Sequence, residues 1–142
     1  MPDVVRVLFL CTHNSARSQM AEAFLNELGG GRFQAFSAGT EARGLHPLSV
    51  QAMAEAGIDI SLQESKTIER FADERFDLMI TVCDEANEAC PYFPNARELR
   101  HWSFPDPSAA GGDDDTRFAA FVAVRDAIRD RIERELLTVR AG

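Results

Sequence analysis

The chain has 142 residues, 45% hydrophobic and 27% charged, which is ordinary for one soluble globular domain with a full core over residues 1–142. Its formal net charge of −8 at pH 7 argues against nucleic acid or an anionic membrane as a partner, because both select for a basic surface. The start of the chain lacks a signal segment, and its apolar run is too short to span a membrane. We therefore expect a cytoplasmic protein, monomeric and without a membrane partner.

The first predicted element is a buried strand over residues 4–10 that stops abruptly at Cys11. Small and polar residues follow, and from Met20 onward apolar residues recur at helical spacing. A loop between a strand and a helix directs its backbone N–H groups, and the positive end of the helix dipole, at one small volume. We therefore expect an oxyanion to bind here. The predicted oxyanion-binding residues are Thr12, His13, Asn14, Ser15, Ala16, Arg17 and Ser18.

The middle of the chain predicts alternating short elements. Three glycines at 29–31 end the first helix, and a short strand is expected over 33–36. Pro47 marks the start of a second helix, which stops at Gly57. A further short helix is expected over 66–71.

The second half predicts two more strands and a long helix. The apolar run at 78–82 is typical of a buried central strand and leads to Cys83. A fourth strand is expected over 98–102, and a solvated turn at 111–115 precedes the last helix. The predicted apolar face of that helix comprises Phe118, Phe121, Val122, Ile128, Ile132 and Leu136.

Strands that alternate with helices predict an α/β fold, here a single domain with a four-stranded parallel sheet flanked by helices. Ligands of such sheets bind beyond the carboxyl ends of the strands. Cys11, Cys83 and Asp106 each follow a predicted strand, so we expect all three at one edge of the sheet.

Cys11 is the residue of the loop that can act as a strong nucleophile, and we expect a thiolate at neutral pH among so many donors. A small buried thiol at a strand end is the ordinary interpretation of a lone cysteine. The spacing Cys-x5-Arg-Ser over residues 11–18 favours a phosphate-binding loop, since Arg17 supplies a planar fork suited to a tetrahedral oxyanion. Within the loop, Asn14 tolerates a left-handed backbone, and Ser18 is placed to donate a hydrogen bond to the thiolate.

Six residues separate Cys83 from Cys90, a spacing that does not fit structural zinc. With Cys11 at the same sheet edge, we interpret the three thiols as a redox relay in which a disulfide forms during turnover. Taken without Cys11, Cys83 and Cys90 would be a core thiol and an incidental surface thiol. The three histidines, His13, His46 and His101, are too scattered for a metal site and are expected to be loop or surface residues.

Four segments make the chain resemble the low-molecular-weight tyrosine phosphatase fold and, within it, the thioredoxin-coupled arsenate reductases. They are CTHNSARSQMAEAF, FSAGTEARGLHPLSVQAMAEAGIDIS, DLMITVCDEANEACP and HWSFPDP. The resemblance implies that arsenate binds the loop, with phosphate or sulfate as competing oxyanions. Cys11 attacks the arsenic, Asp106 is the general acid, and Cys83 and Cys90 complete the relay. No cofactor is bound, and thioredoxin, reduced by NADPH through thioredoxin reductase, supplies the electrons.

The same resemblance implies supporting roles for Glu22 and Ser37, which would hold Asn14 from behind. Some relatives have a monovalent cation near these residues. Here Lys66 takes the place of an acid that helps to bind it, so the lysine ammonium is expected to replace the cation.

Three other functions stay open. A phosphatase for phosphotyrosine or small phosphomonoesters needs Cys11, Arg17 and Asp106 but neither other cysteine. Against it, Ser108 follows Pro107 where phosphatases of this fold usually have an aromatic residue. A non-catalytic oxyanion-binding or redox-sensor module would bind and oxidise without turnover. A reductase that uses a small thiol and glutaredoxin would not need Cys83 and Cys90.

Overall fold

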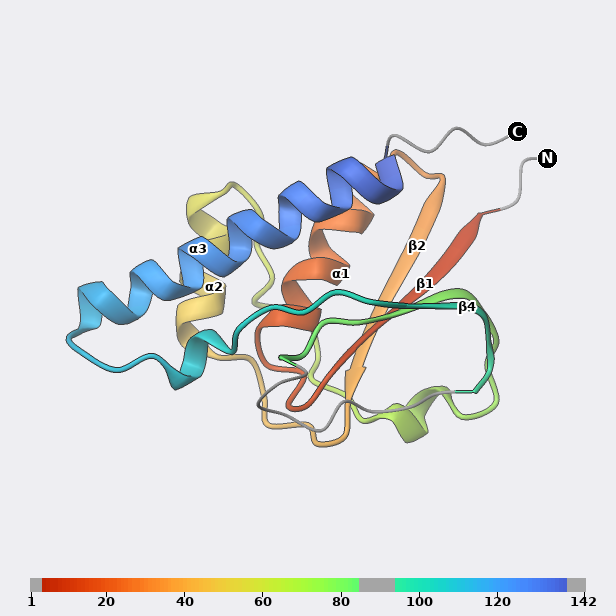
Figure 1. The fold of residues 1–142 in the computed structure, drawn as a ribbon, viewed down its shortest axis with the longest axis horizontal. Coiled ribbons are helices and arrows are strands. Elements are labelled where there is room, and N and C mark those ends of the chain that lie inside the picture. Colours follow the sequence, from red (N-terminus) through yellow and green to blue (C-terminus); the bar gives the residue numbers. More distant parts are fainter. Residues whose placement is uncertain (1–3, 85–93, 138–142) are drawn as a thin grey trace.

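A computed structural model describes residues 4–84 and 94–137, so Cys90 lies outside the described residues. Within these ranges, four strands form one parallel sheet in the order β2-β1-β3-β4 (Figure 1). Their bounds are β1 Val5–Cys11, β2 Phe33–Gly39, β3 Phe76–Thr81 and β4 Ala96–His101. The predicted fold class is confirmed.

The helices of the described ranges follow the predicted punctuation. Their bounds are α1 Arg17–Leu28, α2 Pro47–Glu55 and α3 Asp114–Ile132. Two short 3₁₀ turns are η1 Ile68–Phe71 and η2 Pro107–Ala109, and a π-helical turn, η3 Glu133–Leu137, continues α3. Helix α1 ends at the predicted glycines, with Gly29 as its C-cap, and Pro47 occupies the first turn of α2.

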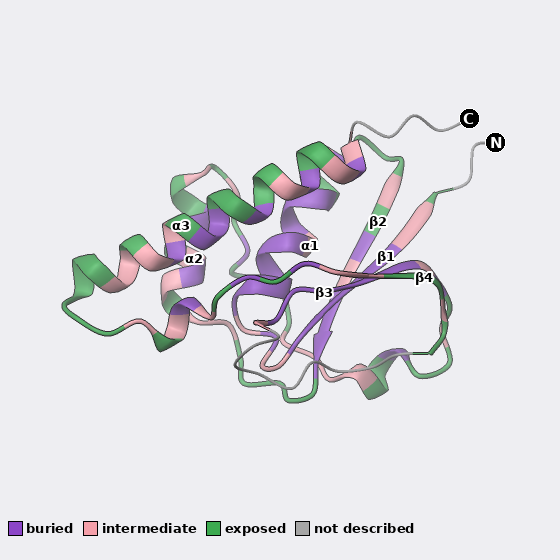
Figure 2. Ribbon diagram, viewed as in Figure 1, coloured by how far each residue is buried: buried purple, intermediate pink, exposed green. Residues whose placement is uncertain are grey.

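Alternate residues of β1 enter two separate cores, because successive side chains of a strand point to opposite faces of the sheet. Val7 and Phe9 belong to the larger core, which α1 and α3 cover. Leu8 and Leu10 belong to the smaller one, which includes Phe71 of η1. Figure 2 shows α1 buried along most of its length, whereas buried and exposed residues alternate along α3.

The structure corrects some predicted bounds. Strand β2 was expected to end at residue 36 but continues to Gly39, because its last residues pair with β1 as far as Cys11. Strands β3 and β4 each begin two residues earlier than expected and end one residue earlier. The helix expected over 66–71 is only the 3₁₀ turn η1, and the hydrophobic pattern did not predict the π-helical turn.

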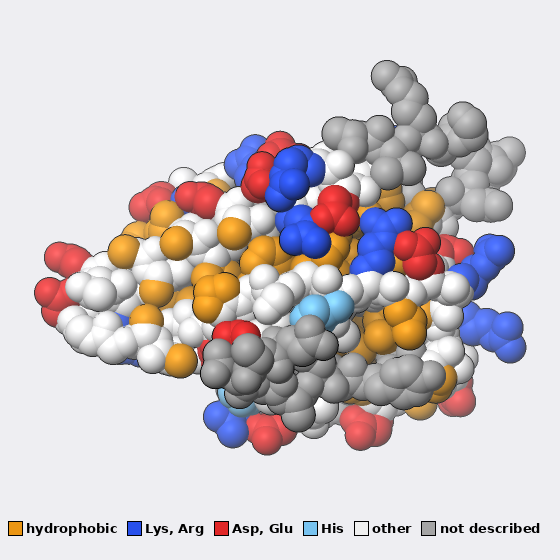
Figure 3. Space-filling view, viewed as in Figure 1, with side chains coloured by type: hydrophobic (Ala, Val, Ile, Leu, Met, Phe, Trp, Pro, Cys, Tyr) orange, Lys and Arg blue, Asp and Glu red, His pale blue; other side chains and the backbone are white. Residues whose placement is uncertain are grey.

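The surface carries charges of both signs. On the face drawn in Figure 3, acidic and basic side chains are intermixed over the later part of α3, and acidic side chains gather where α3 begins. Among the described residues, no helix combines the length and the apolar character needed to cross a bilayer.

Candidate functional site

The predicted nucleophile and its neighbours meet at the carboxyl edge of the sheet. Cys11 ends β1, and Leu10 pairs with Thr81 at the end of β3. The N–H of Val82 donates to the Leu10 carbonyl at 2.8 Å, which brings the residue before Cys83 onto the end of β1. Asp106 lies beyond β4, and its Oδ2 is 3.8 Å from the Arg17 guanidinium. Three segments far apart in the sequence thus converge on the loop after β1.

The loop carbonyls are all engaged from outside the loop. The Thr12 carbonyl accepts from the Glu41 N–H at 3.0 Å, and the His13 carbonyl from the Arg43 N–H at 3.2 Å. The Asn14 carbonyl accepts from Ser65 and Gln19, and the Ser15 carbonyl from His46 and Ser49. In the part of the chain that the structure describes, the N–H groups of residues 13–16 bond no protein acceptor. When the carbonyls of a loop are hydrogen-bonded to neighbouring segments and its N–H groups have no protein acceptor, the N–H groups form an anion-binding concavity.

Helix α1 starts without the groups that normally satisfy a helix N-terminus. Its N-cap residue, Ala16, has no capping side chain, and the first turn contains no acidic residue. Asn14 has φ 49°, a left-handed conformation that Asn tolerates better than most residues. The positive end of the α1 dipole therefore faces the same concavity as the loop N–H groups.

Asn14 orients a chain of hydrogen bonds that ends at the Cys11 sulfur. Its Oδ1 accepts from the Lys66 N–H at 2.7 Å and from Gln19 Nε2 at 2.9 Å, which fixes the direction of the amide. Its Nδ2 then donates to Ser18 Oγ at 2.8 Å. Ser18 Oγ lies 2.9 Å from Cys11 Sγ. Ser18 Oγ thus accepts from Asn14 and retains a proton that it can donate to Cys11, so it links the amide to the nucleophile.

Arg17 and Asp106 form the opposite wall. The Arg17 guanidinium is almost fully buried and donates to the Phe104 carbonyl at 3.2 Å. Asp106 caps η2: its Oδ1 accepts from the Ser108 N–H at 2.9 Å and from Ser108 Oγ at 2.7 Å. Oδ1 is thus held by Ser108, and Oδ2 is the oxygen that faces Arg17.

Glu22, Ser37 and Lys66 lie behind the loop. Ser37 Oγ donates to Glu22 Oε1 at 2.6 Å, and Lys66 Nζ is 3.8 Å from the same oxygen. Burial raises the pKa of Glu22, opposed by the Ser37 hydrogen bond and the Lys66 charge. Burial likewise lowers the pKa of Lys66, opposed by Glu22. The structure gives no direct bond from Glu22 or Ser37 to Asn14 and connects them to it through Lys66.

The described cysteines differ in state. Cys11 is a free thiol with 2% of its surface exposed. Cys83 is fully buried and disulfide-bonded. Cys90, the third predicted member of the relay, lies outside the described residues.

Residues 6–141 match the family described as low molecular weight phosphotyrosine protein phosphatase. An arsenate reductase of Halalkalibacterium halodurans is 46% identical over 127 residues, which cover 89% of this chain and 91% of that protein. The chain belongs to the low molecular weight phosphotyrosine protein phosphatase family.

Solved structures agree with the placement of the chain in its family. An arsenate reductase in the phosphate binding state superposes with a TM-score of 0.76 at 33% identity, over 96% of this chain and 100% of that one. A thioredoxin-dependent arsenate reductase of Corynebacterium glutamicum gives a TM-score of 0.65 at 27% identity, over 96% of this chain and 64% of that one.

The sequence analysis did not predict several residues that hold the loop in place. Gln19 is fully buried and bonds Asn14, and a Cβ on Gly39 would lie 2.7 Å from the Thr12 carbonyl oxygen and 2.9 Å from the Asn14 nitrogen. Ser49 and Ser65 bind loop carbonyls from two other segments. The apolar pattern of the first helix starts at Met20, so it gave no signal for Gln19.

The histidines were expected to be loop or surface residues, and two of them are built into the fold. His46 is half-buried as the N-cap of α2, and His101 ends β4, where its Nδ1 contacts the Thr81 hydroxyl. Within residues 4–84 and 94–137, no group of three metal-ligating side chains is close enough to bind a metal ion.

Proposed function

We propose that the chain reduces arsenate to arsenite through Cys11, Cys83 and Cys90, with thioredoxin as the electron donor. The observation that carries the proposal is the free Cys11 thiol, which is hydrogen-bonded to Ser18 inside an oxyanion loop. The neighbouring strand, β3, leads to the disulfide-bonded Cys83. The arsenate reductases among its relatives support the substrate, and the thioredoxin-dependent relative supports the donor.

In the first step, arsenate binds the N–H groups of residues 12–17 and the Arg17 guanidinium. The Cys11 thiolate attacks arsenic and forms a sulfur–arsenic bond, and one arsenate oxygen departs. Asp106 gives that oxygen the proton with which it leaves as water. The hydrogen bond between Ser18 and Cys11 supports the role of Cys11 as the nucleophile, and the 3.8 Å separation of Asp106 from Arg17 supports the role of Asp106 as the acid.

In the second step, the Cys83 thiolate attacks the Cys11 sulfur. A sulfur–sulfur bond forms, and the electron pair of the sulfur–arsenic bond passes to arsenic. Arsenic(V) is reduced to arsenic(III) and leaves as arsenite, while two thiols become one disulfide. The pairing of Leu10 with Thr81 supports this step, because it brings the ends of β1 and β3 together.

In the third step, Cys90 attacks Cys83, which frees Cys11 and transfers the disulfide to Cys83 and Cys90. A thioredoxin dithiol then reduces that disulfide, and NADPH restores thioredoxin through its reductase. A free Cys11 beside a disulfide-bonded Cys83 is the state that this sequence would leave behind, which supports the order of the steps.

We also propose that the Lys66 ammonium replaces a monovalent cation behind the loop. Lys66 Nζ contacts the Glu64 carbonyl and lies 3.8 Å from Glu22, and these contacts support an ammonium in the place of the cation. Turnover should therefore be the same in potassium and sodium salts at equal ionic strength. A several-fold difference between the two salts would contradict this assignment.

The deciding experiment follows NADPH oxidation with arsenate, thioredoxin and thioredoxin reductase, for the wild type and for Cys11→Ser, Cys83→Ser and Cys90→Ser. We expect turnover in the wild type and none in the three variants. Full activity in Cys83→Ser and Cys90→Ser would refute the relay and favour a small-thiol donor. Cys11-dependent cleavage of an aryl phosphate without arsenate turnover would make the protein a phosphatase.

A further inference from the structure

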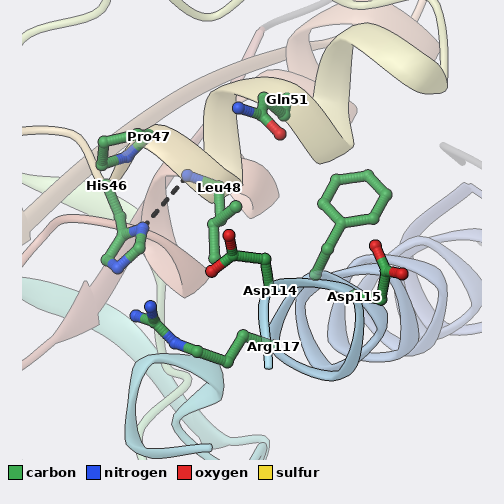
Figure 4. A pocket seen from close by; sticks show the side chains of 8 residues that line it. His46, Pro47, Leu48, Gln51, Asp114, Asp115 and Arg117 are labelled. Carbon is green, nitrogen blue, oxygen red and sulfur yellow. Dashed lines mark hydrogen bonds between the residues drawn. The ribbon is translucent and has the colours of Figure 1, made fainter. Parts of the chain in front are cut away.

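His46 lies where the oxyanion loop meets α2 and α3. Its backbone N–H donates to the Ser15 carbonyl at 3.0 Å. Its ring nitrogen Nδ1 accepts from the Leu48 N–H at 3.1 Å and so caps α2 (Figure 4). The ring packs on Phe121 of α3 with a centroid distance of 4.6 Å. One residue thus connects a carbonyl of the loop to the start of α2 and to Phe121 of α3.

The cap fixes the protonation state of the ring. An Nδ1 that accepts a hydrogen bond carries no proton, so the imidazole is neutral with its proton on Nε2. A second proton would turn Nδ1 into a donor that faces the Leu48 N–H, and the cap would be lost.

The charged groups around the ring come from two further segments. Figure 4 shows the Arg117 guanidinium directed at the imidazole, across a cavity of about 450 Å³ that Asp114 and Asp115 also line. The negative charge of Asp106, at the start of η2, favours the protonated ring, whereas the positive charge of Arg117 disfavours it. Burial and Arg117 lower the pKa of His46, and Asp106 opposes them. The cavity opens the ring to buffer, so the proton can reach it in mild acid.

Ser49 joins the cap to the loop. Its Oγ lies 3.0 Å from the Ser15 carbonyl and 2.7 Å from the His46 carbonyl, so the first turn of α2 holds Ser15 at two points. When the Ser15 carbonyl is fixed outward, the peptide N–H that follows it is fixed toward the anion.

We propose that His46 is a positioning residue whose neutral imidazole holds the oxyanion loop in its binding geometry, and whose protonation releases the loop. The link to arsenate reduction rests on the proposed function, whereas the link to oxyanion binding does not. His46 touches neither the oxyanion nor Cys11 in this scheme. It acts through the first turn of α2 and the Ser15 carbonyl.

The experiment compares the wild type with His46→Asn and His46→Ala. Asparagine caps helices well and does not titrate, so His46→Asn keeps the cap and removes its pH dependence. Inorganic phosphate affinity is measured by calorimetry from about pH 5 to pH 8, the range in which histidine titrates. The ratio of wild-type to His46→Asn affinity cancels the titration of phosphate and of every group that the two proteins share.

We expect the ratio to be constant near neutral pH and to fall about fivefold in acid, the size of a lost helix cap. His46→Ala should bind phosphate more weakly than His46→Asn at every pH, because it lacks the cap throughout. His101→Asn, a matched change at the end of β4, should follow the wild-type pH profile.

Parallel titration of the wild type and His46→Asn would overturn the inference. The outcome is independent of the arsenate assay: a protein that turns over no arsenate but shows the acid-dependent ratio would refute the proposed function and keep the role of His46. Because His46→Asn preserves the cap, a misfolded His46→Ala would not remove the test.

Discussion

Two flanks of the oxyanion loop hold it by different means. The inner flank consists of Asn14, Ser18, Gln19 and Lys66, and the outer flank of Ser15, His46 and Ser49. On the inner flank, Asn14, Ser18 and Gln19 are fully buried and bond one another as well as the loop. On the outer flank, the backbone N–H of His46 and the hydroxyl of Ser49 hold a single carbonyl, that of Ser15. The inner flank contacts the nucleophile through Ser18, whereas the outer flank contacts only the loop backbone.

This difference has an energetic basis. A buried polar group that loses its partner costs more than an exposed one, because no water replaces the lost bond. The inner flank lies beneath the loop and next to Cys11, so a change there affects both folding and chemistry. On the outer flank, His46 lines a cavity, where water can take the place of a lost partner.

The largest effect is expected from Asn14→Ala. The change leaves the Lys66 N–H without its acceptor, removes one of the three acceptors of the Gln19 amide, and places alanine at φ 49°. We expect a loss of about 2–4 kcal/mol in the free energy of unfolding. Misplacement of the loop should also lower kcat/KM about 100-fold.

Asn26→Ala is the matched control for this prediction. Asn26 also bonds a backbone carbonyl and a backbone N–H, both of Ala35 in β2, away from the loop. Urea unfolding should show a loss of stability in both variants, and only Asn14→Ala should lose kcat/KM beyond what unfolding explains. If Asn26→Ala lost as much kcat/KM as Asn14→Ala, the inner flank would have no particular role in activity.

Ser18→Ala should have the next largest effect, and mainly on chemistry. It removes the hydrogen bond to the Cys11 sulfur, and a bond to a charged group contributes about 1.5–3 kcal/mol. The corresponding loss is about 10–100-fold in the rate of Cys11 alkylation by iodoacetamide at neutral pH. Ser103→Ala, at an exposed position, should leave the rate unchanged. An unchanged rate in Ser18→Ala would show that the hydroxyl does not stabilise the thiolate.

Glu22→Gln tests the buried charges behind the inner flank. Burial raises the pKa of Glu22 in the folded state, so its contribution to stability is present below the unfolded value of 4.5 and is lost as pH rises through the folded pKa. Replacement by glutamine should remove that loss. The stability of Glu22→Gln relative to the wild type should therefore increase from about pH 4.5 upward, as measured by urea unfolding at successive pH values.

Glu64→Gln gives the opposite sign and serves as the control. Glu64 is exposed, and its hydrogen bond to Arg70 lowers its pKa, so its contribution is lost as pH falls. A relative stability of Glu22→Gln that stays constant with pH would show that Glu22 is not buried as a charged group.

The amino-acid sequence predicted the strands, the loop and the position of Cys11, Cys83 and Asp106 after strands that end at one edge of the sheet, because these follow from local hydrophobic pattern and from the rule for parallel sheets. It could not predict most of what holds the loop. Ser65, Ser49 and Gly39 come from segments that touch residues 12–15 only after folding. The bond from the His46 N–H to the Ser15 carbonyl was not predicted either, because it depends on the path of the chain beside the loop. Polar partners across long sequence separations carry no periodic signal.

The smallest effect is expected from Ser49→Ala, which repeats the serine-to-alanine change of Ser18 on the outer flank. The Ser15 carbonyl keeps its bond from the His46 N–H, so only one of its two partners is lost. We expect a loss of about 0.5–1.5 kcal/mol in the free energy of unfolding. The rate of Cys11 alkylation should stay the same, because the hydroxyl has no contact with the sulfur. If Ser49→Ala slowed alkylation as much as Ser18→Ala, the charge on the nucleophile would depend on the whole loop and the division between flanks would fail.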